Sequence, residues 1–178
     1  MFGMFAAALL TTQAVPASPK VDDVYEEFGR SGSFEIMTDR SETCSTYFEY
    51  GSDGALLSLV YLPRDESVTL TFVLPAMKAI KVDKTYEVEL SFIIHDKLDD
   101  GWGKVTATGA KWGERPALRI KLRSAPALKD IEVGTVVGLY YNEVNVAAFN
   151  LKNLAAPVRV LKQCGERILK NHPIDPFE

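Results

Sequence analysis

VTLTFVL at residues 68–74 and YEVELSF at residues 86–92 decide the fold class of this chain. In both stretches an apolar or aromatic side chain stands at every second position, with mainly Thr or Glu between. Successive side chains of a strand point to opposite faces of its sheet. This spacing therefore predicts antiparallel strands with one face in the core and the other in water.

Stretches of the same kind fill most of the remaining chain. Further strands are expected at residues 34–36, 44–50, 55–62, 104–112, 118–122, 135–141 and 144–151. Gly and Asp at residues 51–54 predict a tight turn, and Asn142-Glu143 is expected to turn the last hairpin. Residues 96–103 are interpreted as a polar loop, and residues 125–131 as either a short helix or a loop.

The period changes near the C-terminus. Leu154, Val158 and Leu161 are spaced as one stripe of a helix, with Asn153 as a plausible N-cap and Gly165 as its end. The prediction is a mainly β domain, an antiparallel β-sandwich or flattened barrel of about eight strands with one C-terminal helix. Its divisions are a signal peptide at 1–17, an N-terminal linker at 18–33, the domain at 34–165 and an irregular tail at 166–178.

The first 17 residues bear on the compartment. Residues 2–10 are a short apolar run, and Val15-Pro16-Ala17 offers small residues where a signal peptidase cleaves. The run is too short for a membrane helix, which needs about 20 residues. We therefore expect export to the periplasm or outside the cell, and the alternative is a frayed or packed N-terminal segment of a cytoplasmic protein. The later apolar runs are far too short for membrane helices, so no transmembrane segment is expected in the mature chain.

The two cysteines fit an exported chain. Cys44 begins a strand on its inward face, and Cys164 lies near the apolar stripe of the last helix. Two cysteines in an oxidising compartment predict a disulfide, although two separate buried thiols are the alternative. A metal site is not expected, since the chain has only two His and no cofactor motif stands out.

A basic strand supplies the first candidate contact surface. Arg119, Lys121 and Arg123 project from one face, and Arg115 is near. They would suit an anionic ligand, unless Glu87 and Glu89 neutralise them from a paired strand. Trp102 is the other contact candidate. With Trp112, Tyr140 and Tyr141 it would form a binding surface, or these aromatics pack in the core and anchor loops. The net charge of -4 gives no overall case for binding nucleic acid.

Two groups of residues near residue 95 suggest acid–base catalysis or metal binding. His95 with Asp96 or Asp100 would act as a general base in a small hydrolase or lyase, although adjacent residues on a strand point to opposite faces. Asp96, Asp99 and Asp100 with Gly101 would hold Ca²⁺, or form a solvated hairpin loop.

The pattern over residues 34–164 resembles small bacterial periplasmic proteins of the invasion-associated locus B family. The shared features are the export-like start, Cys44 in the first strands, the run of alternating strands, and Asn150-Leu151 followed by Leu161 and Cys164. The resemblance implies an envelope-associated β-sandwich and no catalytic residues.

The leading hypothesis is therefore an exported, non-enzymatic binding or accessory domain whose partner is a protein or cell-envelope component. The alternatives are the hydrolase or lyase, and a carbohydrate- or lipid-binding module. The last would need an exposed aromatic platform or an apolar cavity.

Overall fold

A computed structural model describes residues 25–51, 54–75, 77–95 and 97–171 of the chain. The predicted signal peptide at 1–17 lies outside these residues. The described part contains ten strands and two helices: β1 (Glu26–Ser31), β2 (Phe34–Thr38), β3 (Cys44–Tyr50), β4 (Ala55–Leu62), β5 (Ser67–Val73), β6 (Thr85–Ile94), β7 (Lys97–Trp112), β8 (Arg115–Arg123), α1 (Ser124–Val133), β9 (Gly134–Tyr141), β10 (Val144–Asn150) and α2 (Ala155–Asn171).

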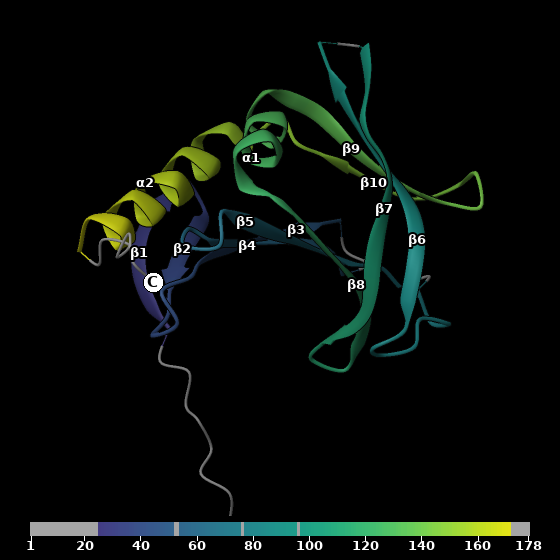
Figure 1. Cartoon of the computed structure of the whole chain (residues 1–178), viewed down its shortest axis with the longest axis horizontal. Coiled ribbons are helices and arrows are strands. Elements are labelled where there is room, and N and C mark those ends of the chain that lie inside the picture. Colours follow the sequence, from purple (N-terminus) through teal and green to yellow (C-terminus); the bar gives the residue numbers. More distant parts are fainter. Residues whose placement is uncertain (1–24, 52–53, 76, 96, 172–178) are drawn as a thin grey trace, which may run out of the picture.

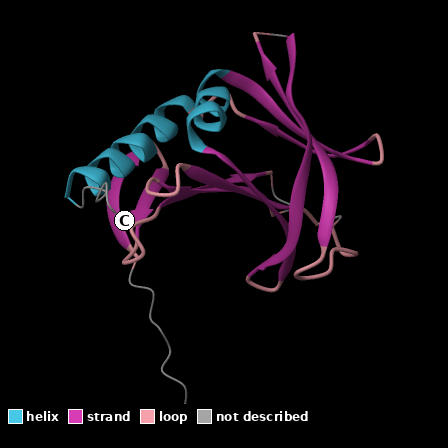
Figure 2. Cartoon of the chain, in the orientation of Figure 1, coloured by secondary structure: helices cyan, strands magenta, loops and turns pink. Residues whose placement is uncertain are grey.

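All ten strands belong to one antiparallel sheet, in the order β1-β2-β3-β4-β5-β8-β7-β6-β9-β10. The sheet curls into a half-barrel, and both helices lie along one side of it (Figures 1 and 2). The mainly β, antiparallel prediction and the C-terminal helix are confirmed. The structure has one continuous curled sheet of ten strands where about eight strands in a sandwich or flattened barrel were predicted. Alternation tells which face of a strand is buried, but not whether sheets are continuous.

The core lies inside the curl, where the alternating apolar side chains meet. In the central pairing of β5 with β8, Leu70 lies opposite Ile120 and Phe72 opposite Leu118, all of them buried. The curl brings β10, at one end of the sheet, close to Tyr50 on β3. Its hydroxyl donates a hydrogen bond of 2.8 Å to the Asn150 carbonyl on β10, and burial raises the pKa of Tyr50 to about 12.

The predicted turn of the last hairpin is confirmed. Asn142 and Glu143 connect β9 to β10, and both have positive φ angles, 49° and 66°. Positive φ at both central residues is what a type I′ turn needs, and its twist matches that of the flanking strands.

The disulfide joins Cys44 at the start of β3 to Cys164 in α2, as predicted, with a Cα–Cα distance of 6.1 Å. Both cysteines are buried. The bond therefore fastens the last helix to the sheet across 120 positions of sequence.

The helix extends beyond its predicted end, so the expected boundary at Gly165 and the irregular tail from 166 need correction. Gly165 lies inside α2, which continues to Asn171. A Cβ at this position would lie 2.3 Å from Cε1 of Tyr61 on β4. Glycine here permits close packing of helix on sheet and does not end the helix.

Two further boundaries differ from the sequence prediction, and one alternative left open is decided. The predicted linker at 18–33 contains β1, whose Phe28 packs on the core and whose Gly29 lies near α2. The predicted loop at 96–103 belongs largely to β7, which pairs with β6 from Lys97 onward. The segment left open as helix or loop is α1. Polar strands such as EEFGRS carry no alternation, and only their pairing and packing reveal them.

Candidate binding surface

The strongest surface candidate is the outward side of the sheet over β3, β4, β5, β8 and β7. We call it the outer face. Strand register aligns one row of side chains across it, running Tyr47, Ser58, Thr71, Arg119 and Thr108. Ser58 and Thr71 are buried, whereas Tyr47, Arg119 and Thr108 are exposed. Small hydroxyl side chains thus form the floor, with longer side chains standing beside them.

Trp112 crosses part of this face. Its ring centroid lies 6.0 Å from that of Tyr47, and it packs on a small apolar cluster that includes Leu56, Val73 and Ala117. The half-buried Trp112 is therefore partly a packing residue, while Tyr47 remains 52% exposed. Tyr47 and Trp112 supply the aromatic contact area that recognition surfaces favour.

Beside this aromatic pair the outer face is hollowed into a groove of about 570 Å³. Its volume lies within the range of ligand-binding clefts. The lining comes from the strands β2 to β4 and their connections, from the residue just before β1, and from the end of β7: Tyr25, Glu35, Met37, Asp39, Ser41, Thr43, Ser45, Thr46, Tyr47, Ser58, Val60 and Trp112.

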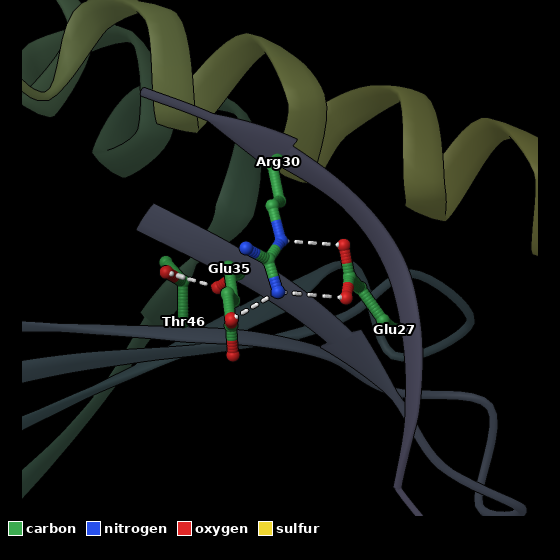
Figure 3. A network of polar contacts seen from close by, with 4 residues as sticks. All are labelled: Glu27, Arg30, Glu35 and Thr46. Atoms are coloured by element: carbon green, nitrogen blue, oxygen red, sulfur yellow. Dashed lines mark hydrogen bonds and ion pairs between the residues drawn. The ribbon is translucent and has the colours of Figure 1, made fainter. Parts of the chain in front are cut away.

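The two carboxylates that line the groove, Glu35 and Asp39, are held in place by hydrogen bonds and an ion pair. Arg30 on β1 lies between Glu27, at 2.8 Å, and Glu35, at 2.6 Å (Figure 3). The hydrogen bond with Arg30 lowers the pKa of Glu27. Asp39 accepts a hydrogen bond of 3.0 Å from the backbone N–H of Thr43. The Thr46 hydroxyl donates to the Glu35 carbonyl at 2.8 Å, which ties β3 to β2 beneath the groove.

The predicted basic strand β8 faces outward as expected, but its charges have different surroundings. Arg115 donates a hydrogen bond to the carbonyl of Gly54, the residue just before β4. Lys121 pairs with Asp65 at 3.3 Å, and both side chains are more than half exposed. Arg119 and Arg123 are exposed and form no ion pair with any described residue. Arg123 lies opposite Ser67, whose buried hydroxyl has no hydrogen-bond partner in the described part of the chain.

The hypothesis that Glu87 and Glu89 neutralise the basic side chains of β8 is wrong. Both glutamates lie on β6, and β7 separates that strand from β8. Glu87 instead forms an ion pair of 3.2 Å with Lys104 on β7. The order of strands, which the sequence does not contain, keeps Arg119 and Arg123 available.

Trp102 does not join this surface, although it was a contact candidate. Its indole N–H donates a hydrogen bond of 2.7 Å to a carboxylate oxygen of Asp130 on α1. Its ring lies 6.4 Å from that of Phe92, and it packs against the core. The alternative of core packing describes Trp102, because its indole N–H bonds Asp130 on α1 and its ring packs beside Phe92 on β6.

The structure separates the four aromatic residues that were considered together as a candidate binding surface. Trp112 contacts Tyr47 on the outer face, whereas Tyr141 lies beside Tyr86, with ring centroids 6.3 Å apart. Tyr140 is half-buried on β9. Sequence reasoning missed Tyr47, since its exposed position on β3 gives no signal until Trp112 is placed next to it.

His95 occupies an exposed turn with a φ of 50° at the tip of the β6–β7 hairpin. It forms no hydrogen bond or ion pair with the side chains that the structure describes. Asp96 and the side chains of Asp99 and Asp100 lie outside the described part, so both the acid–base pair and the Ca²⁺ loop remain sequence predictions. Elsewhere in the described residues, no cluster of His, Cys, Asp or Glu has the form of a metal site.

No family model matches the chain, and the searches of curated proteins and of solved structures likewise give no match. Neither α1 nor α2 combines the length and apolar character that a membrane-spanning helix requires. The interpretation of function therefore depends on the outer face and on the pockets of the described residues.

Proposed function

We propose that the protein is an exported, non-enzymatic binding domain that recognises an acidic protein partner in the cell envelope through its outer face. The proposal rests on Arg119 and Arg123, which are exposed and have no ion-pair partner among the described residues. They lie on the same outer face as the groove lined by Tyr47 and Trp112. Arg and aromatic side chains are the residues in which interface energy concentrates.

The charge distribution favours an acidic partner. An unpaired arginine fork binds carboxylates with two parallel hydrogen bonds, and Arg119 and Arg123 are both exposed on β8. The acidic side of the groove is already partly compensated, because Arg30 pairs with Glu35. A protein is favoured over a small molecule because the row of side chains from Tyr47 to Thr108 spans five neighbouring strands.

Site-specific photo-crosslinking in the native host tests the proposal. A photoreactive residue replaces Thr108, which is exposed next to Arg119, and in a second strain it replaces Lys129 on α1, away from the outer face. We expect a discrete adduct from position 108 and none from position 129. The adduct should be protease-sensitive and should weaken at high salt, since exposed charges are screened.

A charge variant makes the test specific. Arg119→Ser with Arg123→Ser should abolish the adduct, while the matched exposed pair Lys129→Ser with Lys152→Ser should leave it unchanged. The proposal is refuted if no discrete adduct forms, if both crosslinker positions give the same adduct, or if the captured material resists protease and is degraded by glycosidases.

Export is a separate part of the proposal, supported by the buried disulfide and by the resemblance to the invasion-associated locus B family. Mass spectrometry of native material should find Cys44 bonded to Cys164 and residues 1–17 removed. Free thiols on a chain that retains residues 1–17 would contradict export.

A further inference from the structure

A second pocket lies at the rim of the half-barrel, between the connection that follows β5 and the strands β6, β8 and β10. Its volume is about 340 Å³, at the lower end of the range for small-molecule sites. Met77, Val88 and Leu118 line it and are buried, and Val146 on β10 is half-buried. The bottom of the pocket is therefore apolar and reaches the hydrophobic core.

The mouth of the pocket differs in character from its floor. Lys81 and Lys84 line it and are exposed, and none of the described lining residues is acidic. The ammonium of Lys84 lies 5.3 Å from the ring centroid of Tyr86, which in turn contacts Tyr141 edge-on. Two cations thus stand at the entrance to an apolar cavity with an aromatic wall.

The pocket is held open by a fixed backbone. The phenol of Tyr86 accepts a hydrogen bond of 2.9 Å from the backbone N–H of Lys81. Gly109 on β7 bonds the same connection twice at 2.8 Å, accepting from Asp83 N–H and donating to the Lys84 carbonyl. A Cβ at Gly109 would lie 1.9 Å from the Lys81 carbonyl oxygen. The backbone that carries both lysines is therefore positioned by contacts that exist without a ligand, which lowers the cost of binding.

We propose that this pocket binds a small single-chain anionic amphiphile of the fatty-acid carboxylate class. Its alkyl chain lies against Met77, Val88 and Leu118, and its carboxylate accepts hydrogen bonds from Lys81 and Lys84. Apolar burial of the chain supplies affinity, and the two ammonium groups select the charge of the head group. This site is separate from the outer face and does not depend on the partner proposed there.

Methyl NMR distinguishes the two sites within one sample. The chain has four methionines, of which Met77 lines this pocket and Met37 lines the outer groove. Octanoate is titrated into protein carrying ¹³C-methyl methionine. We expect the Met77 signal to shift and saturate while the Met37 signal stays in place. Octanol and octyltrimethylammonium should bind at least tenfold more weakly, since neither presents a carboxylate to the lysines.

Two variants test the lysines and the preformed mouth. Lys81→Gln with Lys84→Gln should weaken octanoate binding roughly tenfold or more, the loss expected for charge-assisted hydrogen bonds, while Lys129→Gln with Lys152→Gln leaves it unchanged. Gly109→Ala should abolish the Met77 response, with folding checked by the unshifted Met37 signal. Equal binding of the cationic probe, a shift at Met37 only, or no saturable shift at Met77 would each overturn the proposal.

Discussion

Gly165→Ala should destabilise the protein, although the same change in most helices is stabilising. Gly165 lies within α2, where alanine would be favoured by about 1 kcal/mol through helix propensity. The structure opposes this gain, because the added Cβ would lie 2.3 Å from Cε1 of Tyr61 and 3.0 Å from Cδ1. Both distances require α2 or the ring to move.

The two effects differ enough in size to predict the sign. Forcing an extra methyl into a packed contact costs about 1–3 kcal/mol. Taking about 2 kcal/mol for the overlap and subtracting about 1 kcal/mol for propensity leaves a net destabilisation of about 1 kcal/mol. The disulfide at the neighbouring Cys164 limits how far the helix can withdraw.

Urea unfolding followed by tryptophan fluorescence measures this change, with the disulfide kept oxidised. The variant Tyr61→Ala removes the ring that causes the overlap. In that background Gly165→Ala should stabilise the protein by about 1 kcal/mol, so the substitution changes sign. The resulting coupling energy of about 2 kcal/mol is within the range for residues in contact. Stabilisation by Gly165→Ala in the wild-type background, or zero coupling, would refute the packing of α2 against Tyr61.

The disulfide closes a loop of 120 positions, so its reduction in the wild-type chain should lower the free energy of unfolding by about 5 kcal/mol. Urea unfolding measures this loss, and a change below about 1 kcal/mol would contradict the prediction. Trp102→Phe removes the hydrogen bond to Asp130 and should cost about 1.5 kcal/mol, more than Trp112→Phe, which keeps its aromatic contact on the outer face. Glu132 on α1 is held by Lys162 and Arg159 of α2, and their hydrogen bonds lower its pKa below the ordinary 4.5. A lowered folded-state pKa contributes stability at neutral pH, and this stability is lost as the pH falls through that pKa. In urea unfolding, wild type should therefore be more stable than Glu132→Gln at pH 7, and this advantage should disappear in acid. A difference in unfolding free energy that does not depend on pH would indicate that charge is not the cause.

The outer face illustrates how much of the site was accessible from sequence. Alternation on β8 correctly placed Arg119, Lys121 and Arg123 on one exposed side. The same reasoning could not say which strands flank β8, so the glutamates of β6 were wrongly considered as partners. It also missed the groove, because Tyr47 and Trp112 are 65 positions apart and meet only where Trp112 reaches across the outer face.

By itself, the sequence determined the strand faces, the Asn142-Glu143 turn and the amphipathic stripe of the last helix. Each of these follows from side-chain direction or backbone freedom over a few neighbouring residues. Only the tertiary structure decided the ten-strand order, the inclusion of β1, the continuation of α2 past Gly165 and the anchoring of Trp102 on α1. These features depend on which distant segments meet, and the free energy of such contacts is absent from any local pattern of residues.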